Sequence, residues 1–308
     1  NVTNNPGYYK NDDKMNPLYE VYGYTYLDKE TSYHKYYVPT EELVKFMRET
    51  NNPLLRVYAD PRANMGNDED GRANYDLFGL ENERYIGVPY GMMAPAGGKF
   101  ASKIGLGVLA RSSSKVDGPL VDLIVMPGCL TGFYLAEAAL RGIIDGGDAA
   151  AKSYYEQAVT AMFNTYERAL QDEALSTDAE KSRPAITGTA AEAAAEFLAQ
   201  DNAAVNWDLM TTFEEKMHAI QAQKWLGLYG IDPVEAWSEI RRTDMPNFLH
   251  ASNSIAEGSK IIARFLYPNG EKTLNPENHD AEGEVNFYSS LVFWDQKNED
   301  KESAEAYQ

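Results

Sequence analysis

The stretch that most constrains the fold runs from Thr211 to Met245, where the sequence predicts two helices joined by a short turn. In the first half, apolar side chains recur at helical spacing: Phe213, Met217, Ile220, Trp225 and Leu228. One side of this helix must therefore be buried. Gly230 ends it. Asp232 can cap the second helix, with Pro233 in its first turn and Glu235 placed as in a capping box.

The second helix of this hairpin is expected to bury Val234, Trp237 and Ile240. Because the connection is so short, the two helices must be antiparallel neighbours. Trp225 and Trp237 are the large side chains expected to fill the space between them. A plain helical hairpin of an all-α protein explains this pattern without any ligand site.

Composition narrows the class of protein. The chain has 308 residues, of which 44% are hydrophobic, so it can bury a substantial core. Its net charge of -19 argues against nucleic acid as a partner, because phosphate binding needs clustered Lys and Arg. Its one cysteine, Cys129, lies in an apolar run and is expected to be a buried, inert thiol.

The hydropathy of the chain and its amino-terminal residues indicate whether it contains a membrane-spanning helix or a targeting segment. No run approaches the ~18 consecutive apolar residues of a spanning helix. The chain begins at Asn1 without Met, a basic leader or an apolar core, so any targeting segment is expected to lie outside this sequence.

Residues 1–41 are rich in Tyr, Asn and Asp and are expected to be extended and loop-like. Their tyrosines either pack on a scaffold or form a stacking surface for a ligand, and packing is the commoner outcome. A short helix is predicted to start near Thr40 and to stop before Asn51-Asn52-Pro53.

From Asp60 to about Val116 the sequence predicts long loops, which in compact proteins are usually functional or disordered. The acidic piece around Asp68 and Asp70 fails the EF-hand pattern, since Gly66 and Leu77 fall at ligand positions. We interpret it first as a solvated turn and second as a weak calcium site. No other cofactor is indicated.

Helical patterns return from Gly128. One helix is predicted up to Gly142, and a second buries one face and is capped by Asp148. That face consists of Tyr155, Val159, Met162 and Tyr166. Small residues between these helices are typical of tetratricopeptide repeats. A further helix is expected over 190–200, and beyond Pro246 the chain should be irregular with a mobile acidic tail.

Catalytic motifs are missing from the sequence. The four histidines are scattered and show no zinc-binding spacing: His34, His218, His250 and His279. Nucleophile-elbow, phosphate-loop and kinase signatures do not occur. A glycosidase needs only two carboxylates close in space, and nothing among 47 acidic residues selects such a pair.

Several motifs in order identify a resemblance. The most specific are Gln223-Lys224-Trp225, Glu235-Ala236-Trp237-Ser238-Glu239 with Arg241-Arg242-Thr243 and Pro246, and Arg264-Phe265-Leu266-Tyr267-Pro268 before Asn275-Pro276-Glu277-Asn278. Others are Asp60-Pro61-Arg62, Tyr85-Ile86-Gly87-Val88-Pro89-Tyr90-Gly91, Leu135-Ala136-Glu137-Ala138-Ala139 with Arg141-Gly142, Tyr154-Tyr155-Glu156 and Trp294-Asp295. In order and spacing, the chain from Asp60 to Asp295 resembles the SusD/RagB family of outer-membrane lipoproteins.

The resemblance implies a mainly α fold of tetratricopeptide-like helix pairs, with long irregular insertions and little β structure. On this basis residues 1–127 form a loop-rich, Tyr-rich segment that contributes ligand-binding loops, and 128–308 form the helical scaffold of the same structural domain. The family usually carries a lipidated cysteine and a further helical region before the Asp60-Pro61-Arg62 motif. The chain therefore resembles the carboxy-terminal majority of such a protein, whose lipid anchor lies outside this sequence.

The resemblance also implies a function that is not enzymatic. Family members bind glycans, or in some lines peptides, at the surface of the outer membrane, and cover a SusC-like TonB-dependent transporter. Sugars present flat apolar faces between hydroxyls, so a glycan site needs exposed aromatic rings beside polar side chains. The candidates are Tyr75, Tyr85, Tyr90 and Trp207, and Trp207 is favoured because it lies between Asn206 and Asp208. Trp225, Trp237 and Trp294 are expected to be buried.

Four functions remain open from the sequence. Glycan binding comes first and peptide capture by a homologue of the same family comes second. A hydrolase with an unidentified carboxylate pair and a helical-repeat adaptor that binds only protein are the others.

Overall fold

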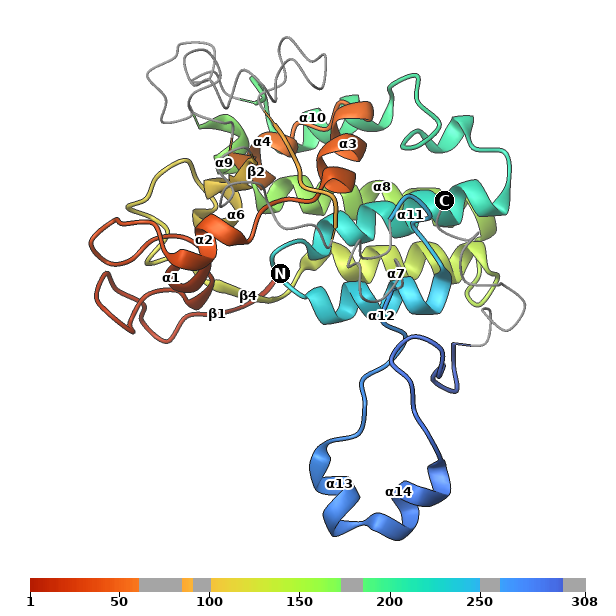
Figure 1. The fold of residues 1–308 in the computed structure, drawn as a ribbon. Coiled ribbons are helices and arrows are strands. Elements are labelled where there is room, and N and C mark those ends of the chain that lie inside the picture. Colours follow the sequence, from red (N-terminus) through yellow and green to blue (C-terminus); the bar gives the residue numbers. More distant parts are fainter. Residues whose placement is uncertain (61–84, 91–100, 173–184, 250–260, 296–308) are drawn as a thin grey trace.

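The computed structural model describes residues 1–60, 85–90, 101–172, 185–249 and 261–295, and over these ranges it is mainly α-helical. The mainly α fold expected from the sequence is confirmed. Figure 1 shows long helices on one side and short helices with irregular chain on the other. Among the described helices, none combines the length and apolar character needed to cross a bilayer.

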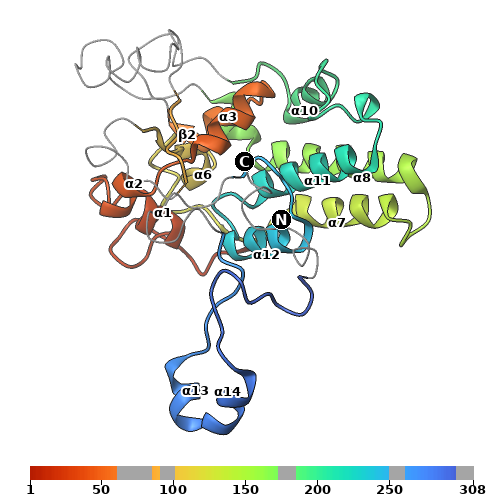
Figure 2. The same cartoon turned by 45° about the vertical axis from the view of Figure 1, so that its right-hand side comes forward.

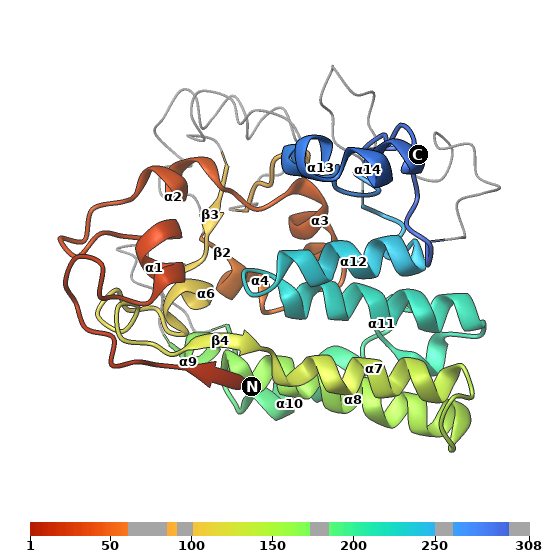
Figure 3. The ribbon, with the colours of Figure 1, turned by 90° about the horizontal axis from the view of Figure 1, so that it is seen from below.

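The body is a stack of antiparallel helices. Helix α7 (Gly128–Leu140) packs along α8 (Gly147–Thr165), α11 (Phe213–Leu228) lies on α7, and α12 (Pro233–Thr243) lies on α11. Figure 3 shows these rods in succession, with α10 (Ala190–Leu198) against α8. A Cβ on Gly132 would lie 2.8 Å from the Cβ of Ala158, so small residues set the close approach of α7 and α8.

The predicted helices of the body are found with their ends close to expectation. Gly142 and Gly230 adopt φ of +69° and +70° just after α7 and α11, a conformation that suits glycine. The Asp232 carboxylate accepts a hydrogen bond from Glu235 N at 3.0 Å, which confirms the cap of α12. At α8 the prediction was wrong: Gly146 occupies the cap position, and Asp148 lies in the first turn.

The predicted inner face of α8 is confirmed, since Tyr155, Val159, Met162 and Tyr166 are all buried. Cys129 is also buried beside α11, and burial raises the pKa of its thiol to about 12, consistent with an inert side chain. At the start of α11, Thr212 and Glu215 form a capping box, which had not been predicted.

The space between α11 and α12 is not filled by tryptophans, and this part of the prediction was wrong. Lys224, which is 1% exposed, forms ion pairs with Glu239 of α12 and with Glu137 of α7, the latter at 3.8 Å. Arg242 donates to both oxygens of Glu137, at 2.7 and 2.6 Å. Gln221 Nε2 also donates to Glu137, at 2.9 Å. Three helices are thus joined by a buried network of paired charges.

Burial by itself would raise the pKa of Glu137, but hydrogen bonds and charge from Arg242, with help from Arg141 and Lys224, lower it to about 2. The carboxylate is therefore ionised at neutral pH. On α12, Val234 is 59% exposed, so the predicted inner face of that helix is wrong at this position.

The indole rings face the irregular segments. Trp225 is half-buried and packs edge-on against Phe248, with ring centroids 5.7 Å apart. Trp237 is also half-buried, and its Nε1 donates to the carbonyl of Ile262 at 2.7 Å. Trp294 is 40% exposed, so the expectation that it is buried was wrong.

Arg241 ties the carboxy-terminal segment to α12. Its guanidinium lies 3.4 Å from the ring centroid of Trp237 and 4.8 Å from that of Trp294, and it donates to Ala263 O at 2.9 Å. Beyond this clamp, α13 (Asn269–Leu274) and α14 (Pro276–Glu282) stand away from the body, as Figures 1 and 2 show. The segment beyond Pro246 was expected to be irregular, and these short helices correct that expectation.

The other side of the molecule is built from short elements. They are α1 (Pro17–Tyr22), α2 (Ser32–Tyr36), α3 (Glu41–Glu49), α4 (Leu55–Tyr58), α6 (Leu106–Ala110) and α9 (Glu167–Gln171). Strand β1 (Val2–Asn4) pairs antiparallel with β4 (Leu123–Met126), and β2 (Ala59–Asp60) with β3 (Lys103–Ile104). Residues 1–41 were expected to be loop-like, whereas α1 and α2 are helical. The helix predicted after Thr40 is α3, and it stops before Asn51 as expected.

Candidate functional site

Trp207, the favoured binding residue, is buried. It lies in a short 3-10 helix (Trp207–Leu209) and is 3% exposed. Its ring packs at 5.4 Å from that of Tyr155, and its Nε1 donates to Asp148 at 3.4 Å. Its neighbour Asp208 pairs instead with Lys152 at 2.6 Å. The expected exposure of Trp207 was wrong, because its ring completes the core while its polar neighbours face outward.

Tyr85 and Tyr90 lie on a segment that runs beside the start of α3. Thr40 forms a parallel bridge with Val88, whose N–H donates to Pro39 O at 3.0 Å. Tyr85 is half-buried against the core, whereas Tyr90 is 52% exposed, so only Tyr90 has the expected exposure. Tyr75, Asp68, Asp70 and the acidic tail lie outside the described residues.

An exposed aromatic surface lies on α1, on α2 and at the end of α2, and we name Tyr22, Tyr33, Tyr36 and Tyr37 the tyrosine patch. The rings of Tyr22, Tyr33 and Tyr37 contact one another pairwise, with centroids 5.3–5.8 Å apart. Tyr33, Tyr36 and Tyr37 are 51%, 66% and 52% exposed. Among the described residues their hydroxyls make no hydrogen bond. The patch therefore offers both apolar ring faces and free polar groups.

Helix α2 holds the patch in place through its buried side. Thr31 Oγ1 accepts from His34 N at 3.1 Å, which caps the helix, and donates to Val21 O at 2.8 Å. His34 is fully buried, and its Nδ1 donates to Tyr22 O at 2.8 Å. Burial lowers the pKa of His34, against the opposing effects of this hydrogen bond and of Glu30. A neutral histidine therefore fixes the backbone under the tyrosines.

The abundance of tyrosine in residues 1–41 is evident from the sequence, but it does not distinguish the residues of the patch from the others. The usable signal was Tyr33 and Tyr37, four residues apart and just after Thr31, which can cap a helix. Such spacing places both rings on one face of a short helix. The prediction that residues 1–41 are extended was therefore wrong for α2.

A groove lies between the turn joining α3 to α4 and the start of α10. Its volume is about 680 Å³, within the range of roughly 300–1,000 Å³ for ligand pockets. Asn51 and Pro53 line one side, and residues 185–200 supply the other. Asn202, which follows α10, connects the two sides, because its Nδ2 donates to Glu49 O at the end of α3 at 3.0 Å.

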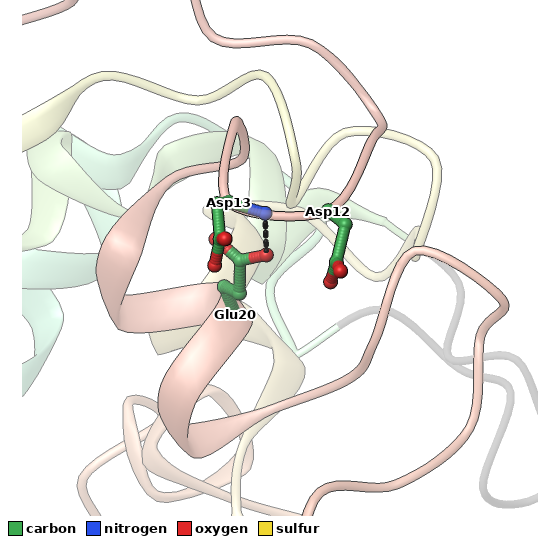
Figure 4. A group of neighbouring side chains, drawn as sticks. All are labelled: Asp12, Asp13 and Glu20. Atoms are coloured by element: carbon green, nitrogen blue, oxygen red, sulfur yellow. Dashed lines mark hydrogen bonds between the residues drawn. The ribbon is translucent and has the colours of Figure 1, made fainter.

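Three acidic side chains, Asp12, Asp13 and Glu20, have carboxylate oxygens within 4.8 Å of one another. Figure 4 shows Glu20 turned toward Asp13, whose N–H donates to Glu20 Oε1 at 2.8 Å. This bond gives the Glu20 carboxylate a role in holding the turn before α1. Nothing beyond the acidic grouping indicates a cation there.

Asp60 is the described carboxyl group with a pKa raised into the range useful for acid catalysis. Burial raises its pKa to about 6, although a hydrogen bond from Leu106 N at 3.1 Å and the charge of Lys103 oppose the shift. Its oxygen is engaged at the start of α6. This geometry fits a structural role.

These features define a helical-repeat scaffold that carries irregular, partly aromatic surfaces. The profile of the SusD-like family, described as "Susd and RagB outer membrane lipoprotein", matches residues 46–295. The chain therefore belongs to the SusD/RagB family, and the resemblance found in its motifs is confirmed.

Solved structures with the same fold include homologues of SusD. A SusD homologue from Bacteroides fragilis gives a TM-score of 0.62 at 21% identity, covering 94% of this chain and 56% of its own. A second SusD homologue from the same species gives a TM-score of 0.66 at 20% identity, and the match covers 96% of this chain and 57% of that homologue. A protein described as chitin-binding gives a TM-score of 0.57 at 23% identity, and the match covers 83% of this chain and 49% of that protein. The chain thus spans about half the length of these structures. No curated protein matches the chain.

Proposed function

We propose that this protein binds oligosaccharides at the cell surface without cleaving them, and passes them to a SusC-like TonB-dependent transporter of the outer membrane. The observation that carries the proposal is the tyrosine patch, a set of exposed rings on a scaffold of the SusD/RagB family. One structural neighbour is described as a chitin-binding protein, which supports a glycan rather than another nutrient as the ligand.

The geometry of the patch suits a sugar. The mutually packed rings of Tyr22, Tyr33 and Tyr37 present apolar surface, onto which the C–H face of a pyranose can stack. Their free hydroxyls, and the exposed Tyr36 beside them, can exchange hydrogen bonds with sugar hydroxyls. Because the rings support one another, little side-chain freedom is lost on binding.

Isothermal titration with a panel of oligosaccharides tests this proposal. We expect at least one to bind, and the double variant Tyr33→Ala/Tyr37→Ala to lose about tenfold in affinity, or about 1.4 kcal/mol. Tyr9→Ala is the matched control, because Tyr9 is 50% exposed but lies outside the ring cluster. A panel without binding, together with tight binding of oligopeptides, would replace glycans by peptides as the cargo.

Two further readouts separate the other functions. New reducing ends after incubation with the same oligosaccharides would identify a hydrolase and overturn the non-catalytic role. Co-purification of a TonB-dependent transporter from outer membranes tests the delivery step. Recovery of the transporter without any glycan binding would instead support an adaptor that binds only protein.

A further inference from the structure

The groove at the start of α10 is separate from the tyrosine patch and has walls that are already held in place. Glu192 accepts hydrogen bonds from the N–H and Oγ1 of Thr189, at 2.8 and 2.9 Å, which forms a capping box. Gln171 Nε2 donates to Gly188 O at 3.0 Å. On the opposite wall, Asn52 Oδ1 accepts from Leu54 N at 3.0 Å. A ligand would therefore meet a preformed surface rather than have to order one.

The groove has an apolar floor and polar edges. Phe197 is 4% exposed and Ile186 is 9% exposed, so both belong to the core beneath. Asn51, Thr187 and Glu196 are exposed at the edges, and their side chains make no hydrogen bond within the described part of the chain. An amide, a hydroxyl and a carboxylate can together donate to and accept from the vicinal hydroxyls of a sugar.

Among the described residues that line the groove, every charged side chain is acidic. Glu192 and Glu196 both line it, and no Lys or Arg is among the described residues that do. Glu192 is committed to the capping box, so Glu196 is the carboxylate left to meet a ligand. The chain as a whole carries a net charge of -19. An anionic ligand would be repelled, and a cationic group would be attracted.

From the volume, the free polar edge groups and the acidic charge of the described lining residues, we propose that this groove is a second carbohydrate subsite that takes neutral or amino sugars and rejects uronic acids and sulfated glycans. Glu196 is its selectivity residue. The inference rests on the proposed glycan-binding function and adds to it the chemical class of the sugar.

Titrations in the Tyr33→Ala/Tyr37→Ala background isolate the groove from the patch. The probes are three tetramers of equal length, made of a neutral hexose, of glucosamine and of a hexuronate. We expect affinity to fall in the order glucosamine, neutral hexose, hexuronate. Glu196→Gln should weaken the affinity for the glucosamine tetramer by about three- to fivefold, as expected for one partly exposed charge pair. It should also reduce the difference in affinity between the glucosamine and hexuronate tetramers.

Glu214→Gln is the matched control, because Glu214 is exposed in the first turn of α11 and is not among the lining residues of the groove. Hexuronate as the tightest ligand, or Glu196→Gln indistinguishable from Glu214→Gln, would overturn the inference. If the unmodified protein binds glycans through Tyr33 and Tyr37 while the background variant binds none, only the groove inference is lost. If the unmodified protein binds no glycan, the proposed function fails as well.

Discussion

Tyrosine behaves in opposite ways in two regions of this molecule. In the helical body Tyr155 is fully buried and its hydroxyl donates to Val205 O at 3.0 Å. Tyr58 is also fully buried and donates to Leu226 O at 2.9 Å. On α2, Tyr33 and Tyr37 are about half exposed and their hydroxyls have no hydrogen-bond partner among the described residues.

The two regions thus use tyrosine for different purposes, burial in the body and exposure in the patch. In the body the rings of Tyr58 and Tyr155 are enclosed and their hydroxyls are satisfied, so these residues contribute to stability. In the patch Tyr22 packs partly against a small core cluster, whereas Tyr33 and Tyr37 pack on Tyr22 and on each other and remain about half exposed. Stability is thus a property of the body and the proposed binding a property of the patch, and this division can be tested.

The largest effect is expected in the buried network of the body. Glu137→Ala would leave Lys224 and Arg242 with a single carboxylate, Glu239, and should lower the free energy of unfolding by about 3–5 kcal/mol. Urea denaturation measures this free energy of unfolding. Glu156→Ala removes an exposed partner of Lys152 and should change stability by less than about 1 kcal/mol. Equal effects of the two substitutions would contradict the structural role of the network.

A smaller effect is expected where α12 holds the carboxy-terminal segment. Arg241→Ala removes a guanidinium between two indole rings and should increase proteolytic cleavage within 261–295 by about tenfold, since each such contact is worth about 0.5–2 kcal/mol. Limited proteolysis with mass spectrometry locates the cuts. Arg264→Ala is the comparison, because its 3.9 Å pair with Glu282 is partly exposed. Unchanged cleavage in Arg241→Ala would show that the clamp does not hold this segment.

Removing one hydroxyl from each region sharpens the comparison directly. Tyr155→Phe leaves the carbonyl of Val205 without its donor and should cost about 1 kcal/mol of stability. Tyr33→Phe should leave stability unchanged, because that hydroxyl has no partner among the described residues. Thermal unfolding of both variants measures the difference. A larger loss for Tyr33→Phe than for Tyr155→Phe would invert the division proposed here.

The smallest effect concerns pH and the support of the patch. Burial lowers the folded-state pKa of His34 below its usual 6.5. The unfolded chain therefore binds the proton more readily, so His34 contributes stability that is present above about pH 6.5 and lost as pH falls through the folded-state pKa. Hydrogen exchange of α2 should accelerate as the pH falls from about 7 to 5, after correction for intrinsic exchange. His34→Gln should reduce this pH dependence. The same pH dependence of exchange in the variant and in the unmodified protein would contradict the role of His34.

The helices of the body could be predicted because their signals are local. Periodic apolar residues marked α8 and α11, and Asp232 with Pro233 marked the start of α12. Such patterns act within a few residues of the chain. Family motifs added the fold, but they did not say what each motif residue contacts.

Contacts between distant residues could not be predicted in this way. Nothing in the sequence indicated that Lys224 would pair with Glu137 and Glu239 between helices. Trp207 was misjudged because Asn206 and Asp208 made its surroundings look exposed. In fact Asn206 caps the 3-10 helix and Asp208 pairs with Lys152, so the polarity of neighbours does not report where an indole ring points.

Measuring stability and glycan affinity on the same two variants tests the separation of scaffold and binding surface most directly. Glu137→Ala should unfold at lower urea concentration yet bind the best oligosaccharide of the panel with unchanged affinity under conditions where it is folded. Tyr33→Ala should unfold at the same urea concentration as the unmodified protein and bind that oligosaccharide more weakly. If both substitutions weaken both properties, or if Tyr33→Ala leaves the affinity unchanged, the account is contradicted.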